Sequence, residues 1–167
     1  ELENKMQFGL INDYTYTSSA FPSDTGVWVH WAFVYNKIGN AMGIFRDGVA
    51  QPLASSGGSN GGTSSGPTSA TIHLGVWKWD TSYNPFNGNM DELRVYAGRA
   101  LVASQIARDF TLQITVDTNL VMSLTFDDAA SLGRDMSCGG NADALSVNAV
   151  PTAGRLCGAE DASGSPC

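Results

Sequence analysis

The residues best suited to chemistry in this sequence are two tryptophans set two positions apart and followed by polar residues. Trp77 and Trp79 share one face of a strand expected at 70–79, because side chains alternate along a strand, and this strand runs into a loop. An indole face can stack on the C–H face of a sugar ring while nearby carboxylate and amide groups hydrogen-bond its hydroxyls. The alternative is core packing of at least one indole, which is the commoner role of a strand tryptophan. The candidate carbohydrate-binding residues are Trp77, Trp79, Asp80, Tyr83 and Asn84.

Asp91 is the second residue that needs a chemical explanation. It lies in a strand expected at 90–97, where alternation places it on the same face as Leu93 and Val95. Leaving a carboxylate unpaired on an apolar face is costly, so we expect Asp91 to have a partner. Three kinds are available: backbone N–H groups of the preceding turn NPFNGN, an arginine, or a metal ion.

The other titratable residues of the expected strands favour structural roles. Glu92 and Arg94 lie two residues apart on the opposite face from Asp91, which predicts a surface ion pair of small value. His30 sits between bulky neighbours and is predicted to be a hydrogen-bonded core histidine. His73 is also a strand residue, and the two histidines show no recognisable metal-ligand spacing.

The paired-acid and zinc-protease patterns of hydrolytic sites are missing from the sequence. Retaining glycoside hydrolysis needs two acids about 5 Å apart, but no E-x-D-x-E occurs, and ELE at 1–3 lacks the rest of that pattern. H-E-x-x-H is absent as well, and the G-x-S-x-G matches GGSNG and GTSSG fall only within the low-complexity stretch 54–70. The net charge of −7 argues against nucleic-acid binding and makes cations the more plausible ionic partners.

The elements expected to position these residues are short strands. Strands are expected at 5–13, 26–35, 70–79 and 90–97, with a hairpin at 41–52 and one helix at 101–110. The strand at 26–35 is apolar on both faces, which predicts that both are covered. Asp47-Gly48 favours a tight hairpin turn, and the low-complexity stretch 54–70 is expected to be a flexible, solvated connection. The fold class predicted is all-β, an antiparallel β-sandwich of the jelly-roll type.

No apolar run approaches the roughly 20 residues that span a membrane, so no membrane insertion is expected.

Four motifs together resemble a known family. WVHWAFVY, GIFRDGV, IHLGVW and FNGNMDELRVYAGRAL come in the order and spacing of a laminin G-like domain, a branch of the concanavalin A-like lectin/glucanase superfamily. The resemblance covers roughly residues 5–110 and implies a concanavalin A-like sandwich with one short helix after the closing strand. The matching residues are Trp28, His30, Ala32, Asp47, Gly48, Gly75, Phe86, Gly88, Asp91, Glu92, Arg94 and Tyr96.

The domain organisation departs from that family in two ways. A complete family domain has several strands before the W-x-H strand, whereas barely one is expected here. In addition, 119–145 is similar to a family opening, with F-D-[DE] followed by D-x-S-x-G-N. We therefore predict the C-terminal part of one sandwich at 1–110, a linker at 111–118, and the opening of a following repeat at 119–167. The alternative is that 119–126 fills the first-strand position of the preceding sheet, because opening and closing strands are neighbours in this family.

The resemblance also implies a metal. Related sandwiches of the glucanase branch often place a structural calcium beside the aspartate that matches Asp91, and calcium prefers hard oxygen ligands. Asp91 is thus a candidate calcium ligand, with a purely hydrogen-bonded role as the alternative. In the tail, Asp127, Asp128 and Asp135 are candidates for the same site or a next one, with a solvated acidic loop as the alternative.

The three cysteines, Cys138, Cys157 and Cys167, all lie near the C-terminal end of the sequence. CGAEDASGSPC is typical of an exposed loop that carries a disulfide, and the odd count leaves one thiol to pair elsewhere. An extracellular or cell-surface location follows from this interpretation, because disulfides persist in oxidising compartments.

The function expected is that of a non-catalytic structural or adhesive module of a larger extracellular multi-repeat protein, with calcium as a possible stabilising ion. Its partners would be other domains or copies of the same protein, and glycans are the second class considered. A carbohydrate-binding module is the alternative. A fragment of a glycoside hydrolase is the third hypothesis, because in glucanases the catalytic strand precedes the W-x-H strand.

Overall fold

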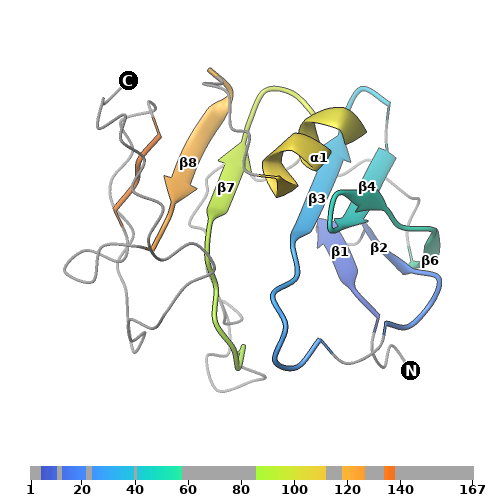
Figure 1. Cartoon of the computed structure of the whole chain (residues 1–167). Helices are drawn as coiled ribbons and strands as arrows, with labels where there is room; N and C mark the ends of the chain where they lie inside the picture. Colours follow the sequence, from blue (N-terminus) through green and yellow to red (C-terminus); the bar gives the residue numbers. More distant parts are fainter. Residues whose placement is uncertain are drawn as a thin grey trace. The chain divides into compact units, whose positions relative to one another are not determined.

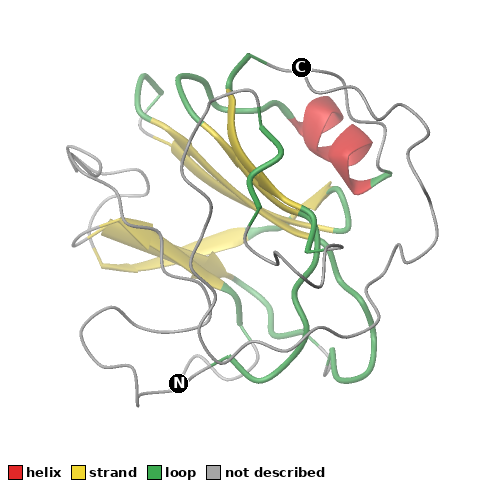
Figure 2. Cartoon of the chain, turned by 90° about the vertical axis from the view of Figure 1, so that its left-hand side faces the viewer, coloured by secondary structure: helices red, strands yellow, loops and turns green. Residues whose placement is uncertain are grey.

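The computed structural model describes residues 5–10, 13–21, 24–39, 41–57, 86–111, 118–126 and 134–137. The chain forms two compact units. The first comprises Glu1–Gly66 and Gly98–Asp117, and the second comprises Pro67–Ala97 and Thr118–Cys167. Each unit is described by itself. Both units contain antiparallel strands, and the one short helix described belongs to the first unit (Figures 1 and 2).

The first sheet of the first unit contains two strands where the sequence predicted one. β1 (Gln7–Leu10) pairs antiparallel with β2 (Asp13–Thr17), which pairs in turn with β6 (Leu53–Gly57). The prediction of a single strand at 5–13 is therefore wrong, and two strands precede the W-x-H segment. One physical reason is the sequence of β2, in which tyrosines alternate with β-branched threonines that favour strand structure.

The second sheet has the order β3-β4-β5. β3 (Trp31–Asn36) pairs antiparallel with β4 (Ala41–Arg46), and β4 pairs with β5 (Val49–Ala50). β3 starts later than the predicted strand at 26–35, because Gly26 adopts a φ of 77° in a turn before it. The prediction that both faces of this strand are covered is wrong as well, since Phe33 is 42% exposed.

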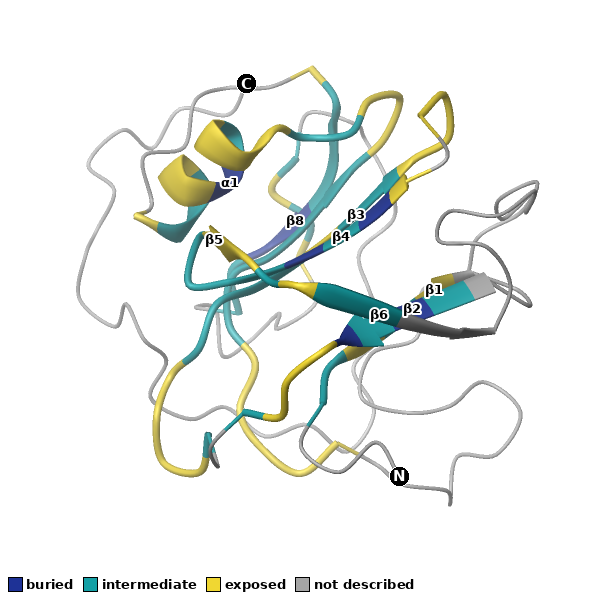
Figure 3. Ribbon diagram, turned by 90° about the vertical axis from the view of Figure 1, so that its right-hand side faces the viewer, coloured by how far each residue is buried: buried dark blue, intermediate teal, exposed yellow. Residues whose placement is uncertain are grey.

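The two sheets pack against each other through small and apolar side chains. Met42 and Ile44 of β4 are buried, as are Thr15 and Thr17 of β2 (Figure 3). The threonine hydroxyls keep their hydrogen bonds, because Thr15 Oγ1 donates to the Ala54 carbonyl at 3.2 Å and Thr17 Oγ1 donates to the Ser19 carbonyl at 3.0 Å. Burial of these two polar groups therefore leaves neither hydroxyl unsatisfied.

Aromatic contact adds a second link between the sheets. The ring of Phe8 in β1 lies against that of Phe33 in β3, with ring centroids 5.4 Å apart. Together with the buried core this arrangement confirms the predicted antiparallel β-sandwich with one short helix.

The hairpin between β4 and β5 closes through the predicted two-residue turn. Asp47 has a φ of 50° and Gly48 a φ of 77°, so both central residues adopt the left-handed conformation that this tight turn requires. Arg46 and Val49 face each other across the turn. The Asp-Gly signal in the sequence is confirmed.

The predicted helix is present as α1 (Ala103–Phe110). Its first N–H groups need partners outside the helix, and Gln105 Oε1 accepts from the Val102 N–H at 3.0 Å. Ile106 is the buried residue of the helix. The helix lies against the hairpin turn, where a Cβ added to Gly48 would stand 3.2 Å from Ala107 Cα and 3.4 Å from Phe110 Cδ1.

The second unit contains a two-stranded antiparallel ladder. β7 (Leu93–Tyr96) pairs with β8 (Leu120–Leu124), and the backbone bond from the Ala97 N–H to the Asn119 carbonyl, 2.8 Å, extends the contact (Figure 1). β7 confirms the closing strand predicted at 90–97, with a later start. The strand predicted at 70–79 and most of the loop predicted at 54–70 lie outside the described residues.

We predict that Gly48→Ala destabilises the first unit more than Gly26→Ala does. Both glycines have φ near 77°, so each alanine carries about 1–2 kcal/mol of left-handed strain. Nothing lies within 4 Å of a Cβ at Gly26, whereas the Cβ at Gly48 meets the helix backbone and adds about 1–3 kcal/mol of overpacking. Urea denaturation of both variants measures the difference. Equal losses would contradict the close packing of the turn on α1.

Candidate functional site

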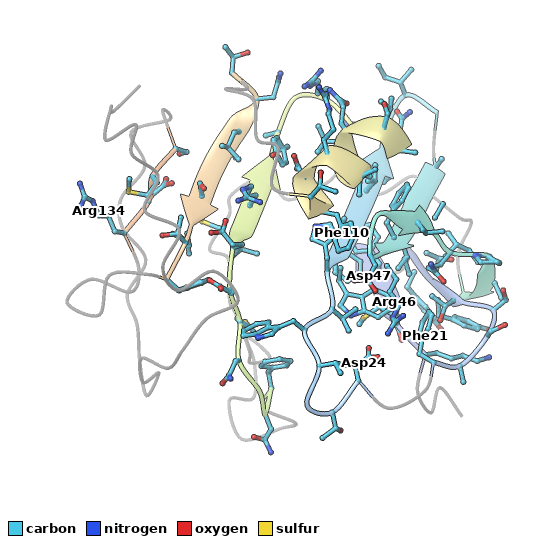
Figure 4. The ribbon with its side chains drawn as sticks, viewed as in Figure 1. Phe21, Asp24, Arg46, Asp47, Phe110 and Arg134 are labelled. Atoms are coloured by element: carbon cyan, nitrogen blue, oxygen red, sulfur yellow. The ribbon has the colours of Figure 1, made fainter. Side chains whose placement is uncertain are left out.

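The densest cluster of charged and aromatic contacts in the first unit surrounds Arg46, at the end of β4. Arg46 Nη2 bonds Asp24 Oδ1 at 2.7 Å, and Nη1 lies 3.6 Å from Asp47 Oδ2. The guanidinium carbon lies 5.5 Å from the ring centre of Phe21 and 5.9 Å from that of Trp31. We call these five residues the Arg46 junction, and Figure 4 shows Phe21, Asp24 and Asp47 grouped around Arg46.

The Arg46 junction holds the chain segment that precedes β3 against the end of β4. Phe21 and Trp31 meet edge to face, with ring centroids 5.1 Å apart. The arginine and aspartate side chains are 25–37% exposed, so their ion pairs are partly screened by solvent and stabilise less than buried pairs would. The guanidinium also lies within cation–π range of both aromatic rings. The junction is therefore a structural contact between two segments.

Asp47 also fixes the W-x-H segment. Its Oδ1 accepts the His30 N–H at 3.0 Å, and its own N–H donates to the His30 carbonyl at 2.9 Å. The His30 ring lies against Phe110 of α1, with ring centroids 5.7 Å apart. Both hydrogen bonds are made by the His30 backbone and the residue is only partly buried, so they do not test the predicted hydrogen bonding of its imidazole, and the predicted core position is wrong.

The closing motif of the second unit differs from the predicted alternation. Glu92 has a φ of 55°, and β7 starts only at Leu93. Asp91 therefore does not share a strand face with Leu93 and Val95, because one left-handed residue interrupts the alternation. Asp91 Oδ1 accepts the Glu92 N–H at 3.1 Å, which is a backbone partner of the kind expected, but from the following residue instead of the preceding turn.

Glu92 and Arg94 form the predicted ion pair, but it is not at the surface. Arg94 Nη2 bonds Glu92 Oε2, and the two side chains are only 7% and 16% exposed, respectively. Removing one partner of such a pair would leave a largely buried charge uncompensated, so truncating either residue should cost more than at an exposed pair.

Asp135 makes a contact in the second unit that the sequence did not reveal. Its Oδ1 accepts the N–H groups of Ser123 at 2.8 Å and Ser137 at 2.9 Å, and its Oδ2 accepts the Ser137 hydroxyl at 3.0 Å. The Met136 N–H donates to the Ser123 carbonyl at 2.8 Å. We call residues 135–137 the Asp135 clamp. It covers the backbone groups of β8 at Ser123, which gives the D-x-S motif a structural role.

Most of the other predicted site residues lie outside the described part of the chain. This holds for the candidate sugar-binding residues, the two further aspartates, the second histidine and the cysteines: Trp77, Trp79, Asp80, Tyr83, Asn84, Asp127, Asp128, His73, Cys138, Cys157 and Cys167. Among the residues that the structure does describe, no group of three or more His, Cys, Asp or Glu side chains is arranged to hold a metal ion. Asp91 and Asp135 are thus the predicted ligands whose surroundings are described, and the Asp135 carboxylate accepts hydrogen bonds from Ser123 and Ser137.

Comparison with known proteins agrees with the fold. The model of the family laminin G 3, described as the concanavalin A-like lectin/glucanases superfamily, matches residues 2–107. The chain therefore belongs to this family, and the resemblance inferred from its motifs is confirmed. No curated protein and no solved structure matches the chain. Within the described ranges, no helix has the length and apolar character needed to cross a membrane.

We predict that Asp135→Ala lowers the protection of the Ser123 amide from hydrogen exchange and destabilises the second unit by about 1–3 kcal/mol, the cost of a buried donor left unsatisfied. Asp135→Asn is the matched control, because the amide keeps an acceptor oxygen for the backbone N–H groups. Exchange followed on the segment 118–126 measures the effect. Unchanged protection in Asp135→Ala would show that the clamp does not hold β8.

Proposed function

We propose that this chain is part of a non-catalytic structural or adhesive β-sandwich module in a larger extracellular multi-repeat protein. The supporting observation is how the described acidic groups are used. Asp24 and Asp47 bond Arg46, Glu92 bonds Arg94, and the Asp135 clamp binds backbone N–H groups. Each of these carboxylates binds an arginine or backbone N–H groups of the fold, whereas a hydrolytic pair needs its acids free to reach a substrate.

The extracellular part of the proposal has two supports. Laminin G-like domains are typically extracellular. The three cysteines in the tail also favour an oxidising compartment. Partners of such a module would be neighbouring domains or further copies of the same protein. Of the two domain arrangements predicted from the sequence, the pairing of β8 with β7 favours the one in which 119–126 lies beside the closing strand over a separate following repeat from 119.

Carbohydrate binding is the alternative, because the superfamily includes lectins and Trp77 and Trp79 stand two residues apart before a polar loop. A glycan array probed with the labelled chain separates the two functions. A structural module gives no signal above background. Binding that is lost in the Trp77→Ala/Trp79→Ala variant and kept in Lys78→Ala would replace our proposal with the lectin function.

A third possibility, a glycoside hydrolase fragment, is tested on the same sample. Incubation with oligosaccharides that bind on the array, or with mixed β-glucans when none binds, should release no reducing sugar. Release above the rate of a heat-denatured sample would contradict the non-catalytic role.

Calcium is proposed as a stabilising ion at Asp91. The support is the chemistry of the residue and its place in the closing motif, because a carboxylate is a hard oxygen ligand of the kind that calcium prefers. Further oxygen ligands would come from Asp127 and Asp128, which lie outside the described residues. A bound calcium would stabilise the folded state by mass action.

We predict that calcium added after chelation raises the Tm of the chain by about 2–4 °C for each kcal/mol of binding free energy. The Asp91→Asn variant should lose this shift, because the amide lacks the charge that attracts the ion. Asp109→Asn, a change on α1, should keep it. If Tm does not respond to calcium in the unaltered chain, the ion is not part of this module.

A further inference from the structure

The segment that precedes β7 is open to water over five successive residues. Residues 86–90, with the sequence FNGNM, are all exposed, and they lie outside the β7–β8 ladder, whose first pair is Leu93 with Leu124. Even the two large apolar side chains of this segment, Phe86 and Met90, are 54% and 41% exposed. Backbone and side-chain groups of the segment can therefore react with solvent without any opening of the sheet.

Asn87-Gly88 is the reactive pair in this segment. The backbone nitrogen that follows an asparagine can attack the side-chain amide carbon and close a succinimide ring, provided that the following residue leaves room. Glycine has no Cβ and the widest choice of backbone angles, so it leaves the most room. Asn89 is also exposed, but it precedes Met90, whose side chain hinders the approach. The same exposed segment thus holds one asparagine that favours ring closure and one that does not.

Gly88 also makes room for the ring of Phe86. A Cβ added to Gly88 would stand 2.9 Å from Phe86 Cζ and 3.1 Å from Cε1, so any larger residue would push the aromatic ring away. The residue that allows this close approach of Phe86 is therefore the same residue that makes Asn87 reactive.

We propose that Asn87 is a site of spontaneous deamidation in the folded chain. Solvent base takes the proton from the Gly88 N–H, the nitrogen bonds to Asn87 Cγ, and the Cγ–Nδ2 bond breaks with release of ammonia. Water then adds to either carbonyl carbon of the succinimide ring and opens it, which yields aspartate in one case and isoaspartate in the other. The net reaction consumes one water and releases one ammonia, and nothing is oxidised or reduced.

The modification changes both the charge and the backbone of the segment. Either product adds one carboxylate to a chain whose net charge is already −7, and places it close in sequence to Asp91 and Glu92. Isoaspartate also inserts one extra methylene into the backbone between Phe86 and Gly88, whose contact depends on their close approach. This inference rests on exposure and residue chemistry, and it is independent of the proposed function.

Peptide mapping of the aged full-length chain tests the proposal. The chain is kept at mildly alkaline pH, and a brief trypsin digestion then releases residues 79–94, which contain Asn84, Asn87 and Asn89. Fragment-ion spectra should place a gain of about 1 Da on Asn87, the mass difference between a carboxyl and an amide group. Asn89 should convert about tenfold more slowly or less, and Asn84 should not convert by this route, because Pro85 has no backbone N–H. Equal conversion of Asn87 and Asn89, or none at Asn87, would overturn the proposal.

A peptide of residues 79–94, aged in parallel, shows what the fold contributes. Because the segment needs no local opening, Asn87 in the chain should convert within about tenfold of its rate in the peptide. Gly88→Ala is the matched variant, and it should slow the conversion of Asn87 by about tenfold or more in both the chain and the peptide. A larger gap between chain and peptide, or an unchanged rate in Gly88→Ala, would overturn the proposal.

Discussion

The left-handed turn at Asp47-Gly48 is the constraint on which most of the first unit depends. Two successive residues with positive φ reverse the chain after β4 and direct the Asp47 side chain back toward the W-x-H segment. Asp47 then binds both the N–H and the C=O of His30, so the turn also sets where the chain enters β3. Because Gly48 has no side chain, α1 can approach the same turn closely. A hairpin, an incoming segment and a helix are therefore all positioned by two residues.

The second unit uses its acidic residues in a comparable way. Asp91 binds the Glu92 N–H at the left-handed residue that precedes β7, and Glu92 binds the largely buried Arg94. Asp135 binds the backbone at Ser123 and so covers one edge of β8. In each case a carboxylate stabilises a backbone conformation or a covered edge that strand propensity alone would not maintain.

The sequence was informative wherever the residue type itself determines the local backbone. Asp-Gly predicted the hairpin turn because few other pairs adopt positive φ twice, and the apolar spacing of Leu101, Ile106 and Phe110 predicted α1. Glu92 shows the limit, because glutamate carries no signal for positive φ, and alternation was therefore assumed through Asp91. The pairing of Asp24 with Arg46 was also hidden, because it joins residues far apart in sequence and depends on how the two segments fold together. Asp135 was considered only as a candidate calcium ligand or part of a solvated acidic loop, since its contact with Ser123 requires β8 to lie beside it.

Amide hydrogen exchange of the unaltered chain in increasing denaturant tests most directly whether the Asp47-Gly48 turn holds the first unit together. The relevant amides are those of His30, Asp47, Ile106 and Thr111, which report on the incoming segment, the turn and the helix. Our account predicts that their opening free energies converge on one common value, as expected for a single cooperative unit. Helix amides that open at a separate, lower free energy, independent of His30 and Asp47, would contradict it.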